Sequence, residues 1–238
     1  MEERVVLITG ATGLLGQAVT RRLARDFMKL ALQFNQNQTL AQALQEELGS
    51  QGNEVEVFQA DLTTEQGCTA LVEKVVERVG RLEVLVNMPG AIIYKSWDTL
   101  TQADWEEIFR SNLISSYFCL KGALKYMRPL KWGRVINIGF HLVEKLGSFP
   151  GITPYAVAKT GLLILTKTAA VAEVENNITV NLVSPGLIEG GQLPEGIKLK
   201  EGQIGKPEDV AEAVAFLASE KAARITGTNL VVAGTWKM

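Results

Sequence analysis

The stretch TGATGLLG, residues 9–16, joins a short apolar run to a segment with helical spacing. It places three glycines at the turn between the two. Glycines there let the backbone turn tightly and approach a pyrophosphate, while the free N–H groups and the positive end of the helix dipole receive its charge. Glycines are also ordinary turn residues, but their position between a first strand and a first helix favours phosphate binding. The residues expected to hold a dinucleotide here are Gly10, Thr12, Gly13, Leu15 and Gly16.

Short β-branched runs recur along the chain, and segments with helical spacing separate them. This alternation favours right-handed crossovers and a mostly parallel sheet with helices on both faces. The predicted fold class is therefore α/β, a Rossmann-type doubly wound sheet of seven parallel strands, with residues 1–238 as a single domain. The predicted strands are Arg4–Thr9, Lys29–Phe34, Glu54–Gln59, Leu82–Asn87, Arg134–Ile138, Ile178–Val183 and Asn229–Val232. The segment Gly186 to Pro207 is rich in Gly and Pro and is predicted to be a loop.

Composition favours a small-molecule site. A formal net charge of -2 gives no electrostatic reason to expect nucleic acid or an anionic membrane as a partner. Cys68 and Cys119 both fall in predicted helices, which argues against a disulfide framework, for a reducing compartment and for buried apolar roles. The N-terminal residues lead straight into a strand pattern with no cationic leader. We expect a cytoplasmic protein.

The end of the second predicted strand bears on the choice of dinucleotide. An NAD-preferring site offers an Asp or Glu to the ribose diol about twenty residues after the glycine turn. This chain offers the neutral residues Gln33 to Asn37, with Asn35 expected to contact the cofactor. No carboxylate there repels a 2′-phosphate and no arginine binds one, so NADP(H) is favoured over NAD(H).

Asp61 and Leu62 follow the third predicted strand at its C-terminal edge, where ligands of doubly wound sheets bind. Asp61 could accept a hydrogen bond from an adenine amino group, or it could cap the helix that follows. The residues alone leave both readings open.

The predicted helix Pro154 to Glu173 carries four successive apolar residues, Leu162 to Leu165, which cover every side of a helix. It should therefore be buried all round. The sheet covers only one face, so we expect a second subunit to cover the other, in a homodimer or homotetramer. Burial by loops of the same chain is the alternative.

Tyr155 and Lys159, in PYAVAKTG at residues 154–161, stand four apart and project from the same side of that helix. An unperturbed tyrosine has a pKa near 10, and acid–base work at neutral pH requires roughly 4 kcal/mol of differential stabilisation. A neighbouring ammonium group carries the positive charge that favours the deprotonated form of the tyrosine. A Tyr and a Lys at this spacing are also common by chance on surface helices.

Taken together, the motifs resemble those of the short-chain dehydrogenase/reductase family over nearly the whole chain. They follow the family's order: the glycine turn, DL at 61–62, N-x-x-G at 87–90, SNL at 111–113, GRVINI at 133–138, Y-x-x-x-K at 155–159, SPG at 184–186, GKPEDVAEAVAFLAS at 205–219 and ITG at 225–227.

The resemblance implies roles for these positions. Tyr155 would donate a proton to a carbonyl, and Lys159 would bind the nicotinamide ribose and lower the tyrosine pKa. Asn112 would hold a proton-relay water. The remaining expected cofactor contacts are Asn87, Gly90, Pro185, Gly186 and Ile188.

The chain departs from the family pattern in its cofactor loops. The family turn is T-G-x-x-x-G-x-G, whereas Gly13 and Leu14 here give the spacing of the family's longer sugar-nucleotide branch, a change we treat as local because the chain is short. Pro89 removes a backbone donor beside the cofactor. The threonine that commonly follows Pro-Gly is replaced by Gly190, and the stretch from there to Gly205 is shorter than the family's usual substrate lid.

The family's catalytic serine is missing. The strand INI continues as Gly139-Phe140-His141, and the usual serine-to-tyrosine spacing falls on Leu142. A loop two residues longer would align the serine with Phe140, leaving His141 and Ser148 as the nearby polar groups. Pteridine reductases of the family also lack the serine, but they carry an aspartate there. His141, the single histidine, is either a substitute hydrogen-bond donor or a loop residue without a role.

The favoured interpretation is an NAD(P)H-dependent reductase of the 3-oxoacyl-reductase-like kind, acting on a small-molecule carbonyl with Tyr155 as proton donor. Two alternatives stay open: a pteridine reductase, and a cofactor-binding regulator or scaffold that has lost turnover. The missing serine suggests the latter, whereas the intact Tyr155, Lys159 and Asn112 argue against it.

Overall fold

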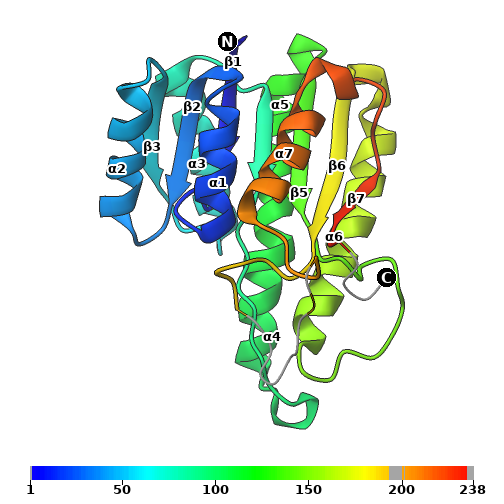
Figure 1. The fold of residues 1–238 in the computed structure, drawn as a ribbon. Helices are drawn as coiled ribbons and strands as arrows, with labels where there is room; N and C mark the ends of the chain where they lie inside the picture. Colours follow the sequence, from blue (N-terminus) through cyan, green and yellow to red (C-terminus); the bar gives the residue numbers. More distant parts are fainter. Residues whose placement is uncertain (1, 193–199, 201, 235–238) are drawn as a thin grey trace.

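Seven parallel strands form a sheet in the order β3-β2-β1-β4-β5-β6-β7 (Figure 1). The computed structural model describes residues 2–192, 200 and 202–234. The strands are β1 (Glu2–Ile8), β2 (Phe27–Phe34), β3 (Glu54–Gln59), β4 (Val84–Asn87), β5 (Gly133–Ile138), β6 (Ile178–Pro185) and β7 (Asn229–Val232). The predicted doubly wound α/β fold is confirmed.

Each predicted strand coincides with an observed one to within two residues at either end. The predicted start of β4 at Leu82 is two residues early, and Glu83 explains the difference. Its buried carboxylate accepts from the backbone N–H of Val5 at 2.9 Å, and its own N–H donates to the Val5 carbonyl at 3.2 Å. A side chain thus takes part in the pairing at this point, and the regular ladder begins one residue later.

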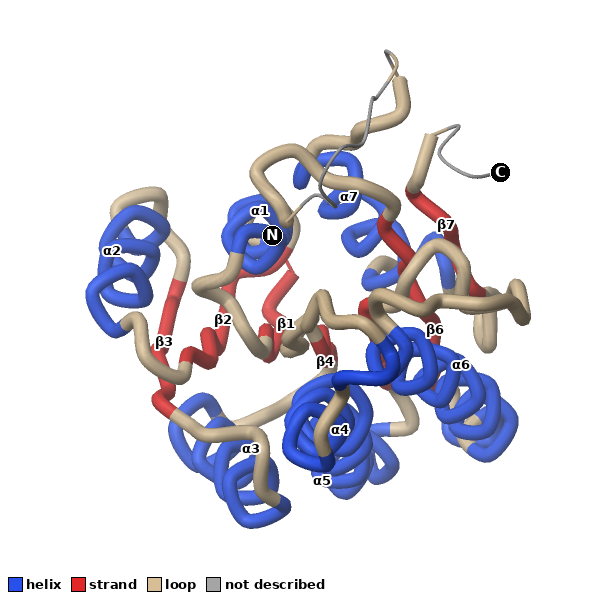
Figure 2. Tube along the Cα trace, turned by 90° about the horizontal axis from the view of Figure 1, so that it is seen from below, coloured by secondary structure: helices blue, strands red, loops and turns tan. Residues whose placement is uncertain are grey.

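Helices cover both faces of the sheet (Figure 2). On one face lie α1 (Leu14–Leu23), α2 (Gln38–Gly49) and α7 (Pro207–Ala218). On the other lie α3 (Glu65–Val79), α5 (Ser115–Leu130) and α6 (Thr153–Ala172). Helix α4 (Gln102–Phe109) leads through a π-helical turn, η2 (Arg110–Ile114), into α5, and the 3-10 turns are η1 (Trp97–Thr99), η3 (Val174–Asn176) and η4 (Glu220–Ala222).

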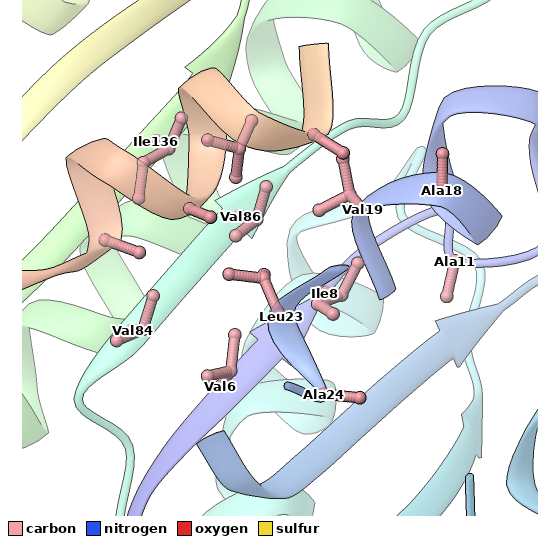
Figure 3. Packing of buried hydrophobic residues seen from close by; sticks show 14 of the residues in the cluster. Val6, Ile8, Ala11, Ala18, Val19, Leu23, Ala24, Val84, Val86 and Ile136 are labelled. Carbon is pink, nitrogen blue, oxygen red and sulfur yellow. The ribbon is translucent and has the colours of Figure 1, made fainter. Parts of the chain in front are cut away.

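The core is apolar on both sides of the sheet. Figure 3 shows one side, where Val19 and Leu23 of α1 pack against Ile8 of β1 and Val86 of β4, all fully buried. Burying one such side chain contributes about 1.5–3 kcal/mol. This packing fixes the start of α1 over β1 and so fixes the glycine turn between them.

The strand order reverses between β1 and β4. From β1 the chain moves outward to β2 and β3, and then returns to β4 on the other side of β1. Ligands of doubly wound sheets bind at the carboxyl ends of the strands at such a switch point. The loops that follow β1 and β4 therefore border the expected cofactor site.

Helix α6 is buried on one side only. Val157, Ile164 and Val171, seven residues apart and so on one side of the helix, are 47%, 63% and 77% exposed. The expectation of burial all round is not met within a single chain, because no loop among residues 2–192, 200 and 202–234 covers this side. Coverage by a second subunit stays a prediction. In the described part of the chain α6 alone has the length and apolar composition of a membrane span, a test that core helices of soluble proteins also pass.

The predicted loop between β6 and α7 is present, and a bridge between Ile188 and Gly205 closes its base. Residues 193–199 and 201, where much of the expected short lid falls, lie outside the described residues.

Candidate active site

The glycine turn has the close backbone approach that its sequence predicts. Gly10 adopts a left-handed conformation, with φ of +66°, which favours glycine. A β-carbon on Gly16 would collide with the Gly10 carbonyl oxygen and lie 2.8 Å from the Ala11 backbone. Gly13 is the N-cap of α1 and has no side chain to occupy the helix N-terminus. The turn therefore leaves an open helix end facing the switch point, which fits a pyrophosphate.

Gln33 is a residue of this site that the sequence did not single out as a structural contact. Its buried amide accepts from the Gly10 N–H at 2.7 Å and donates to the Ala60 carbonyl at 2.7 Å. The side chain thus joins the ends of β1, β2 and β3. It shapes the floor of the groove and occupies one N–H of the glycine turn.

A groove of about 460 Å³ runs over this floor. Its lining includes the predicted contacts Gly10, Thr12, Gly13, Asn35, Asp61, Leu62 and Gly90. Asn35 is exposed at the end of β2, beside the likewise neutral Gln36 and Asn37. The groove has the position and the neutral polar edge expected for the adenosine half of a dinucleotide.

Asp61 does not cap helix α3, whose N-cap is Thr64. Instead its carboxylate accepts from the backbone N–H of Thr63 at 2.9 Å and from the Thr63 hydroxyl at 2.8 Å. These two hydrogen bonds, the backbone one first, lower the pKa of Asp61 below its ordinary value. The group is therefore a carboxylate at neutral pH and can accept from a donor in the groove.

A second cavity of about 670 Å³ adjoins the groove at Gly90, which lines both. Its lining is mainly apolar and includes the predicted contacts Leu15, His141, Tyr155, Pro185, Gly186 and Ile188. A β-carbon on Gly186 would lie 2.7 Å from that of Ala233, so this residue must be small for the strand end to pack. Groove and cavity together offer a continuous site for a dinucleotide and a substrate.

Tyr155 and Lys159 lie on one side of α6, as their spacing predicts. Tyr155 lines the cavity, and the Lys159 ammonium lies 5.6 Å from the centre of its ring. The Lys159 side chain is 4% exposed and donates to the Ile138 carbonyl at 2.7 Å. The end of β5 thus fixes the lysine beneath the tyrosine.

Burial acts on both groups. It lowers the pKa of Lys159 to about 7. It raises the pKa of Tyr155, and the neighbouring phenol of Tyr94 raises it further. Desolvation favours the uncharged form of each group, so Tyr155 is a protonated phenol at neutral pH. A phenol in that form can donate its proton.

Asn112 sits in the π-helical turn between α4 and α5, a local irregularity that is frequent at functional sites. Its amide nitrogen donates to Ala91 and Ile108 carbonyls at 2.9 and 3.0 Å. Its side-chain oxygen is buried and has no partner among the described residues. A β-carbon on Gly90 would collide with that oxygen and lie 3.4 Å from the Lys159 ammonium nitrogen. The unpartnered acceptor therefore lies near the lysine, as a water-holding role requires.

The side-chain nitrogen of Asn87 is bonded within the fold, and its expected cofactor contact stays a prediction. Its buried amide donates to the Asn137 side chain on β5 at 3.0 Å, and Asn137 in turn donates to the Thr166 hydroxyl on α6 at 2.9 Å. This chain of hydrogen bonds connects β4, β5 and α6 behind the site. The side chain thus positions the elements that carry the site.

Phe140 stands where the loop leaves β5 toward the cavity. Its ring packs edge-on against Tyr155, with centroids 5.7 Å apart, and against Phe149, also at 5.7 Å. Leu142 lines the same cavity, so the alignment of the family's serine with Phe140 or with Leu142 stays a prediction. His141 lines the same cavity, but both of its ring nitrogens are buried. A direct donor role for His141 stays a prediction.

Comparison with known proteins agrees with this geometry. Residues 10–235 match the family model described as enoyl-(acyl carrier protein) reductase. The 3-oxoacyl-[acyl-carrier-protein] reductase of Staphylococcus epidermidis is 31% identical, with 96% of each chain covered. The chain belongs to the short-chain dehydrogenase/reductase family.

Other members of the family extend the agreement. The 3-oxoacyl-[acyl-carrier-protein] reductase of Synechocystis is also 31% identical, over 97% of this chain and 96% of the relative. A solved structure, a blue fluorescent protein from a metagenomic library in complex with NADPH, is similar with a TM-score of 0.90 and 30% identity, covering 99% of this chain and 98% of that one. As a short-chain dehydrogenase/reductase, this protein is an NAD(P)-dependent oxidoreductase that acts on a small molecule.

Two parts of the site were missed by sequence reasoning. Gln33 was treated only as a neutral residue near the ribose, and Tyr94 was not considered. Tyr94 follows Gly90 by four residues in a loop, yet it lines the cavity beside Tyr155. No periodicity or motif marks either position.

Proposed function

We propose that this protein is an NADPH-preferring carbonyl reductase, with 3-oxoacyl thioesters as its first candidate substrates. One observation carries the proposal: the protonated phenol of Tyr155 lines an apolar cavity, and Lys159 is fixed beneath it by the Ile138 carbonyl. The two relatives named as 3-oxoacyl-[acyl-carrier-protein] reductases support the substrate class.

The dinucleotide fits the site. The glycine turn would hold the pyrophosphate, and Asn35 and Asp61 would line the adenosine half. Lys159 would bind the nicotinamide ribose, with Gly90, Pro185, Gly186 and Ile188 around the nicotinamide. The preference for NADPH is supported by the neutral end of β2 and by the relative solved with NADPH.

The reduced nicotinamide supplies a hydride when bound. The carbonyl oxygen gains negative charge as hydride arrives at its carbon, and Tyr155 gives that oxygen a proton. The charged form of Lys159 stabilises the phenolate that results. A water held near Asn112 would return a proton toward this pair.

The proposal is tested on ketones, 3-oxoacyl thioesters and dihydropteridines, each with NADPH and with NADH, followed by nicotinamide absorbance. Tyr155→Phe should remove most turnover while cofactor affinity stays nearly unchanged. Tyr126→Phe, on α5 away from the cavity, is the matched control. Turnover that survives Tyr155→Phe within a few-fold would refute the proton-donor role.

The substrate panel also separates the alternatives. Reduction confined to dihydropteridines would identify a pteridine reductase, and cofactor binding without reduction of any compound would favour a regulator or scaffold. A clear preference for NADH in calorimetric titration would overturn the cofactor assignment.

We also propose that residues 1–238 act as one domain in a cytoplasmic homodimer or homotetramer without nucleic-acid or membrane partners. The exposed apolar side of α6 supports the oligomer.

A further inference from the structure

The described cavity lining offers few side-chain donors for a carbonyl oxygen. Besides Tyr155, the polar side chains among its described lining residues are Tyr94, His141 and Gln192. Phe140 and Leu142, the two positions that can align with the family's serine, have no polar side-chain atom to donate. A reductase that relies on Tyr155 alone lacks one preorganised donor to the developing oxyanion.

His141 and Gln192 are poorly placed to supply that donor. Both ring nitrogens of His141 are buried, so neither is accessible to a substrate in this conformation. Gln192 is exposed on the loop after β6, and its backbone carbonyl accepts a hydrogen bond from another lining residue. That residue is Tyr94.

Tyr94 has the required chemistry and access. The side chain is 46% exposed, and its hydroxyl donates to the Gln192 carbonyl at 3.3 Å. An O–H···O hydrogen bond is usually 2.5–3.0 Å long. The observed bond is therefore weak, and the phenol can exchange this acceptor for a substrate oxygen at little cost.

The backbone holds Tyr94 toward Tyr155. The N–H of the next residue, Lys95, donates to the Gly151 carbonyl at 3.0 Å, only four residues before Tyr155. The Lys95 ammonium is fixed in turn by Asp104 at 2.7 Å. The loop after β4 is thus joined to the loop that precedes α6. The effect of Tyr94 on the pKa of Tyr155 is consistent with two phenols facing one space.

We propose that Tyr94 is the second hydrogen-bond donor to the substrate's carbonyl oxygen, in place of the family's missing serine. This inference rests on the proposed function and adds a catalytic residue to it. Tyr155 transfers its proton, whereas Tyr94 keeps its own and stabilises the oxyanion through a hydrogen bond. The two phenols would approach the oxygen from different elements, Tyr94 from the loop after β4 and Tyr155 from α6.

The experiment compares the wild type with Tyr94→Phe, using an acetoacetyl thioester and NADPH. Removing one donor to an oxyanion typically lowers kcat by about 10²–10³-fold. We expect Tyr94→Phe to lower kcat to this extent with KM changed only a few-fold, because the bond forms mainly in the transition state. Cofactor affinity and thermal unfolding should match those of the wild type. Tyr126→Phe serves as the control with the same chemical change.

A second variant tests whether Tyr94 and the missing serine do the same work. Phe140→Ser should raise kcat by a larger factor in the Tyr94→Phe background than in the wild type. An equal rise in both backgrounds would show independent contributions and overturn the inference. If Phe140→Ser leaves kcat unchanged in both backgrounds, the serine does not reach the carbonyl. The kcat of Tyr94→Phe relative to the wild type then decides whether the inference holds.

Failure of this inference can be told from failure of the proposed function. An active wild type with Tyr94→Phe within twofold of it overturns the role of Tyr94 only. A loss in Tyr94→Phe that is matched by weaker cofactor binding or lower thermal stability also overturns it, since a structural role would explain that loss. A wild type that reduces no carbonyl refutes the proposed function and the inference together.

Discussion

Lys159→Met should stabilise the folded protein at pH 7 while it abolishes turnover. Burial lowers the pKa of Lys159 from 10.5 to about 7, so the folded state binds its proton less well than the unfolded state. At pH 7 this difference costs the fold about 4 kcal/mol. The variant loses the hydrogen bond to the Ile138 carbonyl, worth about 1–3 kcal/mol with the desolvation of that carbonyl. The flexible methionine side chain fills the space that the lysine leaves. The free energy of unfolding at pH 7 should therefore rise by about 1–3 kcal/mol.

The pH dependence of the free energy of unfolding follows from the direction of the Lys159 pKa shift. Between pH 7 and 10.5 the unfolded lysine holds a proton that the folded lysine has released, so the stability of the wild type rises with pH across this window. Lys159→Met lacks this contribution. Its stability advantage should therefore shrink by about 2 kcal/mol between pH 7 and pH 9.

Urea denaturation at pH 7 and pH 9 measures both quantities. Lys167→Met, which removes a half-exposed lysine from the same helix, controls for the loss of a charge from α6. A difference between wild type and Lys159→Met that stays constant from pH 7 to pH 9 would refute the reasoning, because the buried amine would then titrate as it does in the unfolded chain.

Three further predictions concern the turn, the buried polar chain and the outer side of α6. Gly16→Ala should weaken NADPH binding at least tenfold in a fluorescence titration, because the added β-carbon collides with the Gly10 carbonyl; Gly49→Ala, with open space around it, is the control, and unchanged affinity in Gly16→Ala would contradict the assigned turn. Asn137→Ala should lower the free energy of unfolding by about 1–3 kcal/mol, since it removes the hydrogen bonds to Asn87 and Thr166, which keep only their bonds to backbone carbonyls; a loss below about 0.5 kcal/mol in urea denaturation would show that the chain of amides is dispensable. Ile164→Glu should reduce the molar mass in sedimentation by half or more if a second copy covers α6, and an unchanged mass would place any interface elsewhere.

The parts of the molecule that could be predicted from sequence are those with local causes. The β-branched runs predicted all seven strands. The central ones, such as β4, are buried on both faces and so need apolar residues at nearly every position. The glycine turn was predictable because its constraints are local: Gly10 has a positive φ, and Gly16 lies close to the Gly10 carbonyl oxygen. Tyr155 and Lys159 were predictable because a spacing of four places two side chains on one side of any helix.

The parts that were missed depend on contacts between distant segments. Gln33 joins three strand ends that only the sheet order brings together, and Tyr94 reaches the cavity only because Lys95 is bonded to Gly151. Glu83 pairs with Val5 through its side chain, a contact that no strand pattern in the sequence predicts. In each case the residue type was ordinary for its position in the sequence, so the fold alone gives it a role.

Burial of Tyr155 determines the protonation state of its phenol in the resting site. A phenol that protonates a carbonyl must hold its proton until the oxygen becomes basic, and burial raises the pKa of Tyr155 in that direction. Oxidation of an alcohol would require the phenolate first, a form that the same burial disfavours. Lys159, with a pKa of about 7, can bind a proton near neutrality just as the phenol loses its own, so that positive charge accompanies the new phenolate. Burial therefore keeps the proton on Tyr155 in the resting site, and a protonated Lys159 offsets the cost of the phenolate that donation creates, in either direction of the reaction.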